Sequence, residues 1–260
     1  MSHLAEILAS KRVELVELDD ATRSPVPRKA LDVVGALRRN GPMHVIAEVK
    51  QRSPSAGPLS RALSPHARAV AYAKAGASMV SVLVDGPFFG GSWTDLAAAR
   101  RALDAGGLQV PLLAKEFVID ERQIEEARDR GADAVLLIAR IVDATTLARL
   151  ATAAREEGIE PLVEVATEDE LDAALAAAAR IIGVNARDLD TLALDPERAA
   201  RVLARIPPST VAVHLSGLKT AEDVTRVAHG RADAALIGEV LMRQDNPAPL
   251  LAELVAAAGK

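Results

Sequence analysis

Short apolar runs alternate with longer, Ala-rich amphipathic segments along most of the chain. This alternation predicts strand and helix units repeated around a parallel sheet. Helical patterns fill the gaps between the runs. We assign strands to eight of the runs, at residues 43–49, 79–84, 111–114, 134–138, 160–164, 181–185, 210–214 and 234–237.

The joints before three of these runs resemble one another, as expected for short turns with Gly at helix ends. They are Gly76-Ala77-Ser78, Gly131-Ala132-Asp133 and Arg231-Ala232-Asp233. We therefore predict an α/β fold with one domain over residues 1–260, a closed (β/α)8 TIM barrel. An open, doubly wound sheet also accommodates eight strands, but the dinucleotide-binding pattern GxGxxG does not follow the first run.

The first 42 residues precede the barrel and are predicted to form a helical extension. Residues 4–18 are a charged amphipathic stretch, and a Pro-rich link follows at residues 24–27. This composition indicates an extra helix of the barrel and not a separate domain.

Composition narrows the function classes. No run of about 18 uncharged apolar residues is present, and the start MSHLAEILASKR carries charge where a signal peptide is apolar, so we expect a cytoplasmic protein with no membrane partner. A net charge of −5 with interspersed signs argues against a nucleic-acid partner and favours a small molecule. Zero cysteines exclude thiol chemistry, and the five histidines lack metal-ligand spacing, so no metal is expected.

Polar residues at the ends of four predicted strands share one face. Barrel side chains alternate between the interior and the helix layer, so apolar Ala47 and Val49 should face outward. A single inward charge is explained well by the exposure of a strand end to solvent. Charges from four strands at one barrel mouth instead favour an active site, in which Lys and Glu act as proton donors and acceptors. The inward set is Glu48, Lys50, Lys115, Glu164, Asn185 and Arg187.

Two further features indicate a phosphorylated ligand with a flat ring. Ser216-Gly217 and Gly238-Glu239 follow the seventh and eighth strands, the usual phosphate position in barrels, although ordinary Gly turns explain them equally well. All three Phe and the one Trp lie in loops after the second and third strands, where they either hold an aromatic substrate or plug the barrel.

The segment IAEVKQRSPS, residues 46–55, resembles the first-strand signature of indole-3-glycerol-phosphate synthase. Further similarity follows in order at residues 88–92, 113–119, 133–138, 162–165, 183–189 and 238–243, so that the resemblance covers about residues 3–255. It implies a cofactor-independent carboxy-lyase of tryptophan biosynthesis. The implied substrate is 1-(2-carboxyphenylamino)-1-deoxyribulose 5-phosphate, which undergoes ring closure, decarboxylation and dehydration.

The resemblance also implies a role for each candidate residue. Lys115 would be the general acid, Glu164 the base and Lys50 a second acid or charge partner. Glu48 would hold both lysines in place, and Asn185 would bind the reacting hydroxyl. The implied substrate-binding residues are Ser53 and Arg187 for the anthranilate and ribulose parts, Phe89, Phe117 and Leu136 around the ring, and Ser216, Gly217 and Gly238 for the phosphate, with Leu215 and Glu239 beside them.

The chain departs from the family pattern at two positions. Leu215 stands where the family usually has Glu, and its parity points it at the mouth, so Lys50 has one carboxylate partner fewer. Glu116 stands where the family usually has Asp, and the alternation along the strand predicts that its side chain faces outward. Two alternatives therefore stay open: a diverged paralogue acting on a related arylamine sugar phosphate, or a non-catalytic ligand-binding barrel. We expect a monomer or a weak homo-oligomer.

Overall fold

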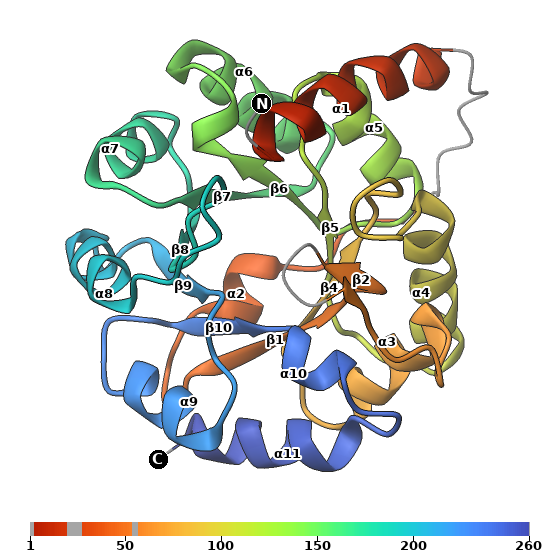
Figure 1. Cartoon of the computed structure of the whole chain (residues 1–260), viewed down its shortest axis with the longest axis vertical. Coiled ribbons are helices and arrows are strands. Elements are labelled where there is room, and N and C mark those ends of the chain that lie inside the picture. Colours follow the sequence, from red (N-terminus) through yellow and green to blue (C-terminus); the bar gives the residue numbers. More distant parts are fainter. Residues whose placement is uncertain (1–2, 20–27, 54–56, 260) are drawn as a thin grey trace.

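The computed structural model of the chain describes residues 3–19, 28–53 and 57–259. Eight parallel strands close into a barrel, which confirms the predicted fold and rules out the open, doubly wound sheet. Figure 1 shows the strands at the centre with the helices around them. The barrel strands are β1 (His44–Val49), β4 (Met79–Leu83), β5 (Leu112–Lys115), β6 (Ala134–Ile138), β7 (Glu160–Val165), β8 (Ile181–Asn185), β9 (Val211–Leu215) and β10 (Ala234–Ile237).

Helices follow the barrel strands and cover the outside of the barrel. They are α3 (Pro65–Lys74), α4 (Trp93–Ala105), α5 (Glu121–Asp129), α6 (Ala144–Glu156), α7 (Glu168–Ala176), α8 (Pro196–Arg205), α9 (Ala221–Ala228), the short α10 (Glu239–Met242) and α11 (Ala248–Ala257), with a 3-10 turn η1 at Ala139–Ile141. Most begin at a Ser, Thr or Asp whose side chain accepts a hydrogen bond from a backbone N–H of the first turn, which satisfies a donor that the helix leaves free. These caps are Ser64, Ser92, Asp120, Asp143, Thr167, Asp195 and Thr220.

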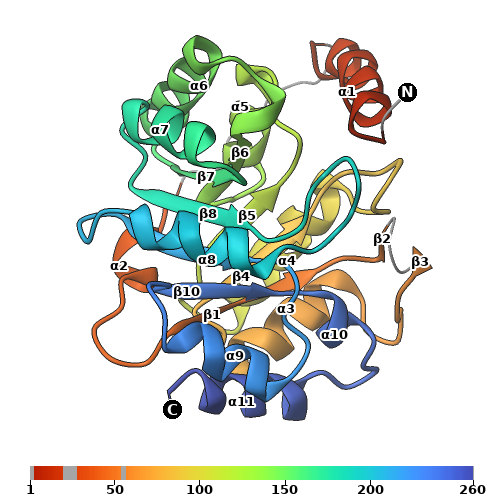
Figure 2. The same ribbon diagram turned by 60° about the vertical axis from the view of Figure 1, so that its left-hand side comes forward.

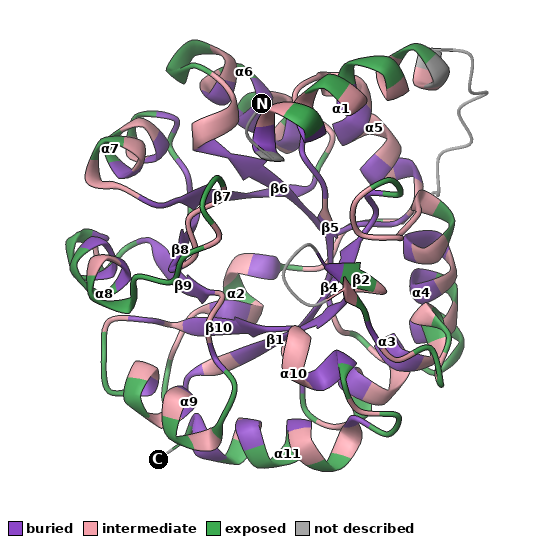
Figure 3. Cartoon of the chain, viewed as in Figure 1, coloured by how far each residue is buried: buried purple, intermediate pink, exposed green. Residues whose placement is uncertain are grey.

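The alternation of side chains along the strands divides the core into two layers. Ala47 and Val49 belong to the outer layer between strands and helices, as predicted. Ile46, Leu113 and Leu162 belong to the inner layer that fills the barrel. Figure 3 shows the strands as almost continuously buried. Inward-facing residues that lie past this inner layer, toward the carboxyl ends of the strands, therefore project into the mouth of the barrel.

The N-terminal extension contains two helices, α1 (His3–Asp19) and α2 (Val33–Leu37). Helix α1 confirms the helix predicted at residues 4–18, whereas the Pro-rich link at 24–27 lies outside the described residues. Figure 2 shows α1 at the same end of the barrel as β2 (Arg52–Ser53) and β3 (Gly57–Pro58), a short antiparallel pair that the sequence pattern did not predict. Within the described ranges, no helix is long and apolar enough to cross a membrane.

Two of the three similar joints use the same contact. Gly131 adopts a left-handed φ of 86° at the end of α5, and the Asp133 carboxylate that follows accepts a hydrogen bond from Leu112 N at 2.8 Å. Asp233 likewise accepts from Ala212 N at 2.8 Å. Each aspartate thus fixes the start of a neighbouring strand, at the first residue of β5 and the second residue of β9.

Asp133→Ala should lower the free energy of unfolding by about 3–5 kcal/mol, because breaking a buried ion pair leaves charges without partners. Asp133 is fully buried and also pairs with Arg28 at 2.8 Å and Arg100 at 3.5 Å. Urea denaturation followed by circular dichroism measures the loss. The control is Asp233→Ala, which should cost about 1 kcal/mol since Asp233 is 16% exposed. Equal losses in the two variants would contradict this ranking.

Candidate active site

One cavity opens at the carboxyl end of the barrel. The structure places every candidate residue from the sequence on its wall: Glu48, Lys50, Ser53, Phe89, Lys115, Phe117, Leu136, Glu164, Asn185, Arg187, Leu215, Ser216, Gly217, Gly238 and Glu239. These residues come from six of the barrel strands and from the loops that follow strands. Barrel closure brings them together although up to 191 positions separate them in sequence, the span from 48 to 239.

A chain of polar contacts at the cavity floor joins β5, β7 and β8, and it passes over β6, which lies between β5 and β7. The Lys115 Nζ lies 3.5 Å from Glu164 Oε2, and Asn185 Nδ2 donates to Glu164 Oε1 at 2.8 Å. The Asn185 Oδ1 in turn accepts from Arg187 N at 2.9 Å, which fixes the orientation of the amide. Glu164 is only 3% exposed. Both of its oxygens are therefore engaged, and Lys115 has a carboxylate beside it.

A second ion pair lies across the cavity. Lys50 Nζ is 2.7 Å from Glu48 Oε1, and Glu48 is buried. Glu48 was expected to hold both lysines, but the structure pairs it with Lys50 and pairs Lys115 with Glu164. The two lysines thus have separate carboxylate partners, because their strands lie on either side of β4.

Glu239 adds a third carboxylate at the rim. Burial acts to raise the pKa of Glu239, but the hydrogen bond from Arg243 and the positive charges of Arg243, Lys50 and Arg187 outweigh it, so the pKa lies below its ordinary value. Arg243 donates to Glu239 at 2.9 Å. An ionised carboxylate therefore remains beside the cationic side of the cavity.

Leu215 points into the cavity, as its parity predicts. It is 2% exposed and belongs to the inner apolar layer. A Cβ placed on Gly183 would lie 2.7 Å from Leu215 Cδ1, so the glycine of the neighbouring strand makes room for the leucine. An apolar side chain thus occupies the position where the resemblance led us to expect a carboxylate.

The loop after β9 has an uncommon backbone conformation. Ser216 adopts φ 70° and Gly217 φ 87°, and a left-handed Ser is strained. The ring of His214 lies behind this turn, with Nε2 3.0 Å from Ser216 O. Burial lowers the pKa of His214, so the ring is neutral near pH 7 and donates to that carbonyl. Small residues at this edge leave the backbone accessible from the cavity.

Aromatic side chains form the opposite wall. The rings of Phe89 and Phe117 have centroids 6.0 Å apart and are tilted by 32°. Trp93, which was grouped with them, instead begins α4 and packs against the outer layer. The grouping failed for Trp93 because a helix start, and not a loop, fixes its direction.

The sequence analysis missed the contribution of α1 to the cavity. Leu4 and Ile7 line it and are buried. The amphipathic pattern predicted the helix, but no local signal indicates which part of the barrel a separate helix will cover. Leu189 and Leu192, from the loop after β8, also line the cavity, and Arg187 donates to Leu192 O at 2.9 Å.

Comparison with known proteins gives one consistent family. A sequence model described as indole-3-glycerol phosphate synthase matches residues 3–254. The chain is 43% identical over 237 residues to an indole-3-glycerol phosphate synthase of Mycobacterium ulcerans, covering 91% of the chain and 84% of the relative. It is 40% identical over 264 residues to that of Beutenbergia cavernae, covering 99% and 96%.

Solved structures of other barrels share the fold. The 3-hexulose-6-phosphate synthase of Salmonella typhimurium matches with a TM-score of 0.62 at 16% identity, covering 83% of the chain and 98% of that structure. Thiamine phosphate pyrophosphorylase from Pyrococcus furiosus matches with a TM-score of 0.63 at 12% identity, covering 87% and 98%. At these identities the likeness concerns the fold alone.

Gly238→Ala should destabilise the protein by about 1–3 kcal/mol through overpacking of the cavity floor. The added Cβ would lie 2.4 Å from Glu48 Oε1, too close for Glu48 to keep its place beside Lys50. Chemical denaturation measures the effect. Gly86→Ala is the control, because its Cβ would make only an ordinary contact of 3.6 Å with Gly91 O. If Gly238→Ala leaves the free energy of unfolding unchanged, Glu48 can move away from the added Cβ without cost.

Proposed function

The chain belongs to the indole-3-glycerol phosphate synthase family, and we propose that Lys115 and Glu164 carry out the acid–base steps of that reaction while Asn185 hydrogen-bonds the reacting hydroxyl. The activity is that of a carboxy-lyase in tryptophan biosynthesis. The substrate, 1-(2-carboxyphenylamino)-1-deoxyribulose 5-phosphate, is a small phosphorylated compound. The observation that carries the assignment of residues is the contact chain from Lys115 through Glu164 to Asn185.

The reaction forms one carbon–carbon bond and breaks another. The ring carbon that bears the carboxylate attacks the ketone carbon, while Lys115 protonates the ketone oxygen. Loss of carbon dioxide restores the aromatic ring. The new hydroxyl then takes up a proton and leaves as water, and Glu164 removes a proton to complete the double bond of the indole.

The geometry supports this division of roles. Lys115 is 19% exposed, so its ammonium group reaches the cavity while its carboxylate partner Glu164 stays buried. An ammonium next to the ketone oxygen stabilises the negative charge that develops there during attack. Asn185 holds Glu164 at 2.8 Å and can also contact the reacting hydroxyl from the cavity floor.

Other groups would bind the two ends of the substrate. Phe89 and Phe117, with Leu136, provide an apolar wall for the anthranilate ring. The turn at Ser216-Gly217 and the backbone at Gly238 provide N–H groups for the phosphate. Arg187 and Ser53 also line the cavity and would bind the carboxylate and the ribulose chain.

Lys50 would act as the second acid or as a charge partner for the substrate carboxylate. Its ion pair with Glu48 keeps it in place until the substrate arrives. Glu239 adds negative charge nearby and partly replaces the carboxylate that Leu215 does not supply. With this function we also propose a cytoplasmic location, where pathway intermediates are made, and a monomeric or weakly self-associating state, which light scattering would measure.

Purified protein should convert 1-(2-carboxyphenylamino)-1-deoxyribulose 5-phosphate to the fluorescent indole product. Lys115→Ala and Glu164→Gln should each reduce turnover at least about a hundredfold, since a positioned acid or base contributes on that order. Arg12→Met, an exposed site on α1, is the control and should leave turnover unchanged. Full turnover in both Lys115→Ala and Glu164→Gln, with folding verified by circular dichroism, would refute the proposed roles.

Leu215→Glu should raise turnover of the same substrate by about tenfold, equivalent to about 1.4 kcal/mol of barrier, because a second carboxylate would orient Lys50. Leu215→Gln has nearly the same shape without the charge and serves as the control. If both variants lose activity while folding normally, Leu215 is required where it is, and a related arylamine sugar phosphate becomes the substrate to assay next.

A further inference from the structure

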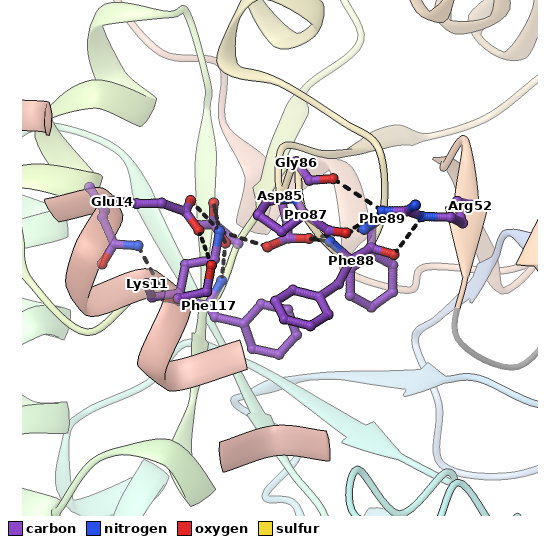
Figure 4. A network of polar contacts seen from close by, with 12 residues as sticks. Lys11, Glu14, Arg52, Asp85, Gly86, Pro87, Phe88, Phe89 and Phe117 are labelled. Carbon is purple, nitrogen blue, oxygen red and sulfur yellow. Dashed lines mark hydrogen bonds and ion pairs between the residues drawn. The ribbon is translucent and has the colours of Figure 1, made fainter. Parts of the chain in front are cut away.

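A buried lysine of the N-terminal helix lies at the centre of a charged cluster outside the acid–base chain. Lys11 is only 1% exposed. Its Nζ lies 2.8 Å from Glu14 of the same helix, 2.7 Å from Asp85 after β4 and 3.1 Å from Glu116 after β5. Figure 4 shows Lys11 with Glu14 and Asp85. One cation thus joins α1 to two loops of the barrel mouth.

Both loop carboxylates also hold the backbone beside an aromatic residue of the cavity. Asp85 Oδ2 accepts from Phe88 N at 2.8 Å and from Phe89 N at 2.9 Å. Glu116 Oε1 accepts from Phe117 N at 2.7 Å. The side chains that contact Lys11 are therefore the ones that set the positions of Phe89 and Phe117.

In this cluster three carboxylates contact one ammonium group, so negative charge is in excess. Burial acts to lower the pKa of Lys11, but Glu116 and Asp85 raise it well above its ordinary value, so Lys11 keeps its charge. Burial raises the pKa of Glu116 to about 7, with Lys11 and the N–H of Phe117 opposing the rise and Asp85 adding to it. Removing Lys11 would leave buried carboxylates facing one another, which displaces them.

We propose that Lys11 is a positioning residue that fixes the place of the aromatic slot, the apolar surface that the packed rings of Phe89 and Phe117 present to the cavity. It does so through Asp85 and Glu116, and it does not touch the substrate. The role rests on the proposed function, in which this slot binds the anthranilate ring. Arg52 holds the same loop from the other side, where it donates to Phe88 O at 3.1 Å. Lys11, through Asp85, and Arg52 therefore hold the loop that carries Phe89 from two sides.

The test separates ring binding from phosphate binding at the far end of the cavity. Lys11→Met should raise the Kd for anthranilate about tenfold or more, because charged hydrogen-bonded partners of the slot lose their place. The Kd for inorganic phosphate should stay within about twofold of wild type. Isothermal titration measures both. In turnover assays KM should rise while kcat stays within about threefold, since the acid–base chain is intact.

Three companion variants sharpen the test. Lys11→Arg restores the cation and should recover anthranilate binding to within about threefold. Arg12→Met removes an exposed cation one residue away and should change neither ligand. If Lys11→Met does not fold, Lys11→Met/Glu116→Gln replaces it, because that pair of changes removes one positive and one negative charge together.

Each outcome decides the proposal. Unchanged anthranilate binding in folded Lys11→Met would overturn it, and so would equal weakening of anthranilate and phosphate, which would indicate general loosening. A third outcome separates the two proposals: the wild-type protein binds anthranilate, Lys11→Met weakens that binding, and the wild-type protein does not turn over the family substrate. This outcome would support the role of Lys11 and refute only the proposed function.

Discussion

Closure of the barrel determines the direction of every strand side chain, and the rest of the site depends on that constraint. Each of the eight strands has two hydrogen-bonded neighbours. A slip of one residue in β1 would move Glu48 and Lys50 into the apolar layer under the helices and bring Ala47 inside. The register therefore forces the charged ends of the strands to share one small space. Buried charges need partners, and the two ion pairs Glu48–Lys50 and Lys115–Glu164 provide them.

Crowding at the mouth explains two glycines, Gly183 on β8 and Gly238 directly after β10. Glu48 occupies the space where a Gly238 side chain would be, and Leu215 occupies that of Gly183. In both pairs a large inward side chain on one strand lies over a glycine that belongs to the neighbouring strand or directly follows it. The position of Gly238 therefore has two consequences: it lets Glu48 reach Lys50, and it leaves backbone exposed to the cavity at the place where a phosphate would bind.

Local pattern predicted the barrel strands to within one residue at every end, as well as their parity, because both depend on the burial of residues within each strand. Parity then located Glu48, Lys50 and Leu215 inside the mouth. Contacts between distant elements had no such signal. The link from Lys11 to Glu116 spans 105 positions, and nothing in either segment indicates that α1 covers the loops after β4 and β5. The β2–β3 pair was missed for another reason, since strands of two residues are too short to show an alternating pattern. The outward direction of Trp93 was missed because the start of α4 fixes it.

The paired lysines also influence which ligands the site accepts. A ligand with no acceptor near Lys115 leaves the pair with Glu164 undisturbed and gains only apolar contact with Phe89 and Phe117. A ligand with a ketone oxygen at that point gains a charged hydrogen bond, which is stronger than a neutral one, and gains more as the oxygen becomes negative. In the mechanism that we propose, the slot and the phosphate turn would therefore supply affinity, and the lysine pairs would supply selectivity for a reacting carbonyl. Leu215 would weaken charge recognition on the side of Lys50 alone, because Lys115 is paired with its own carboxylate.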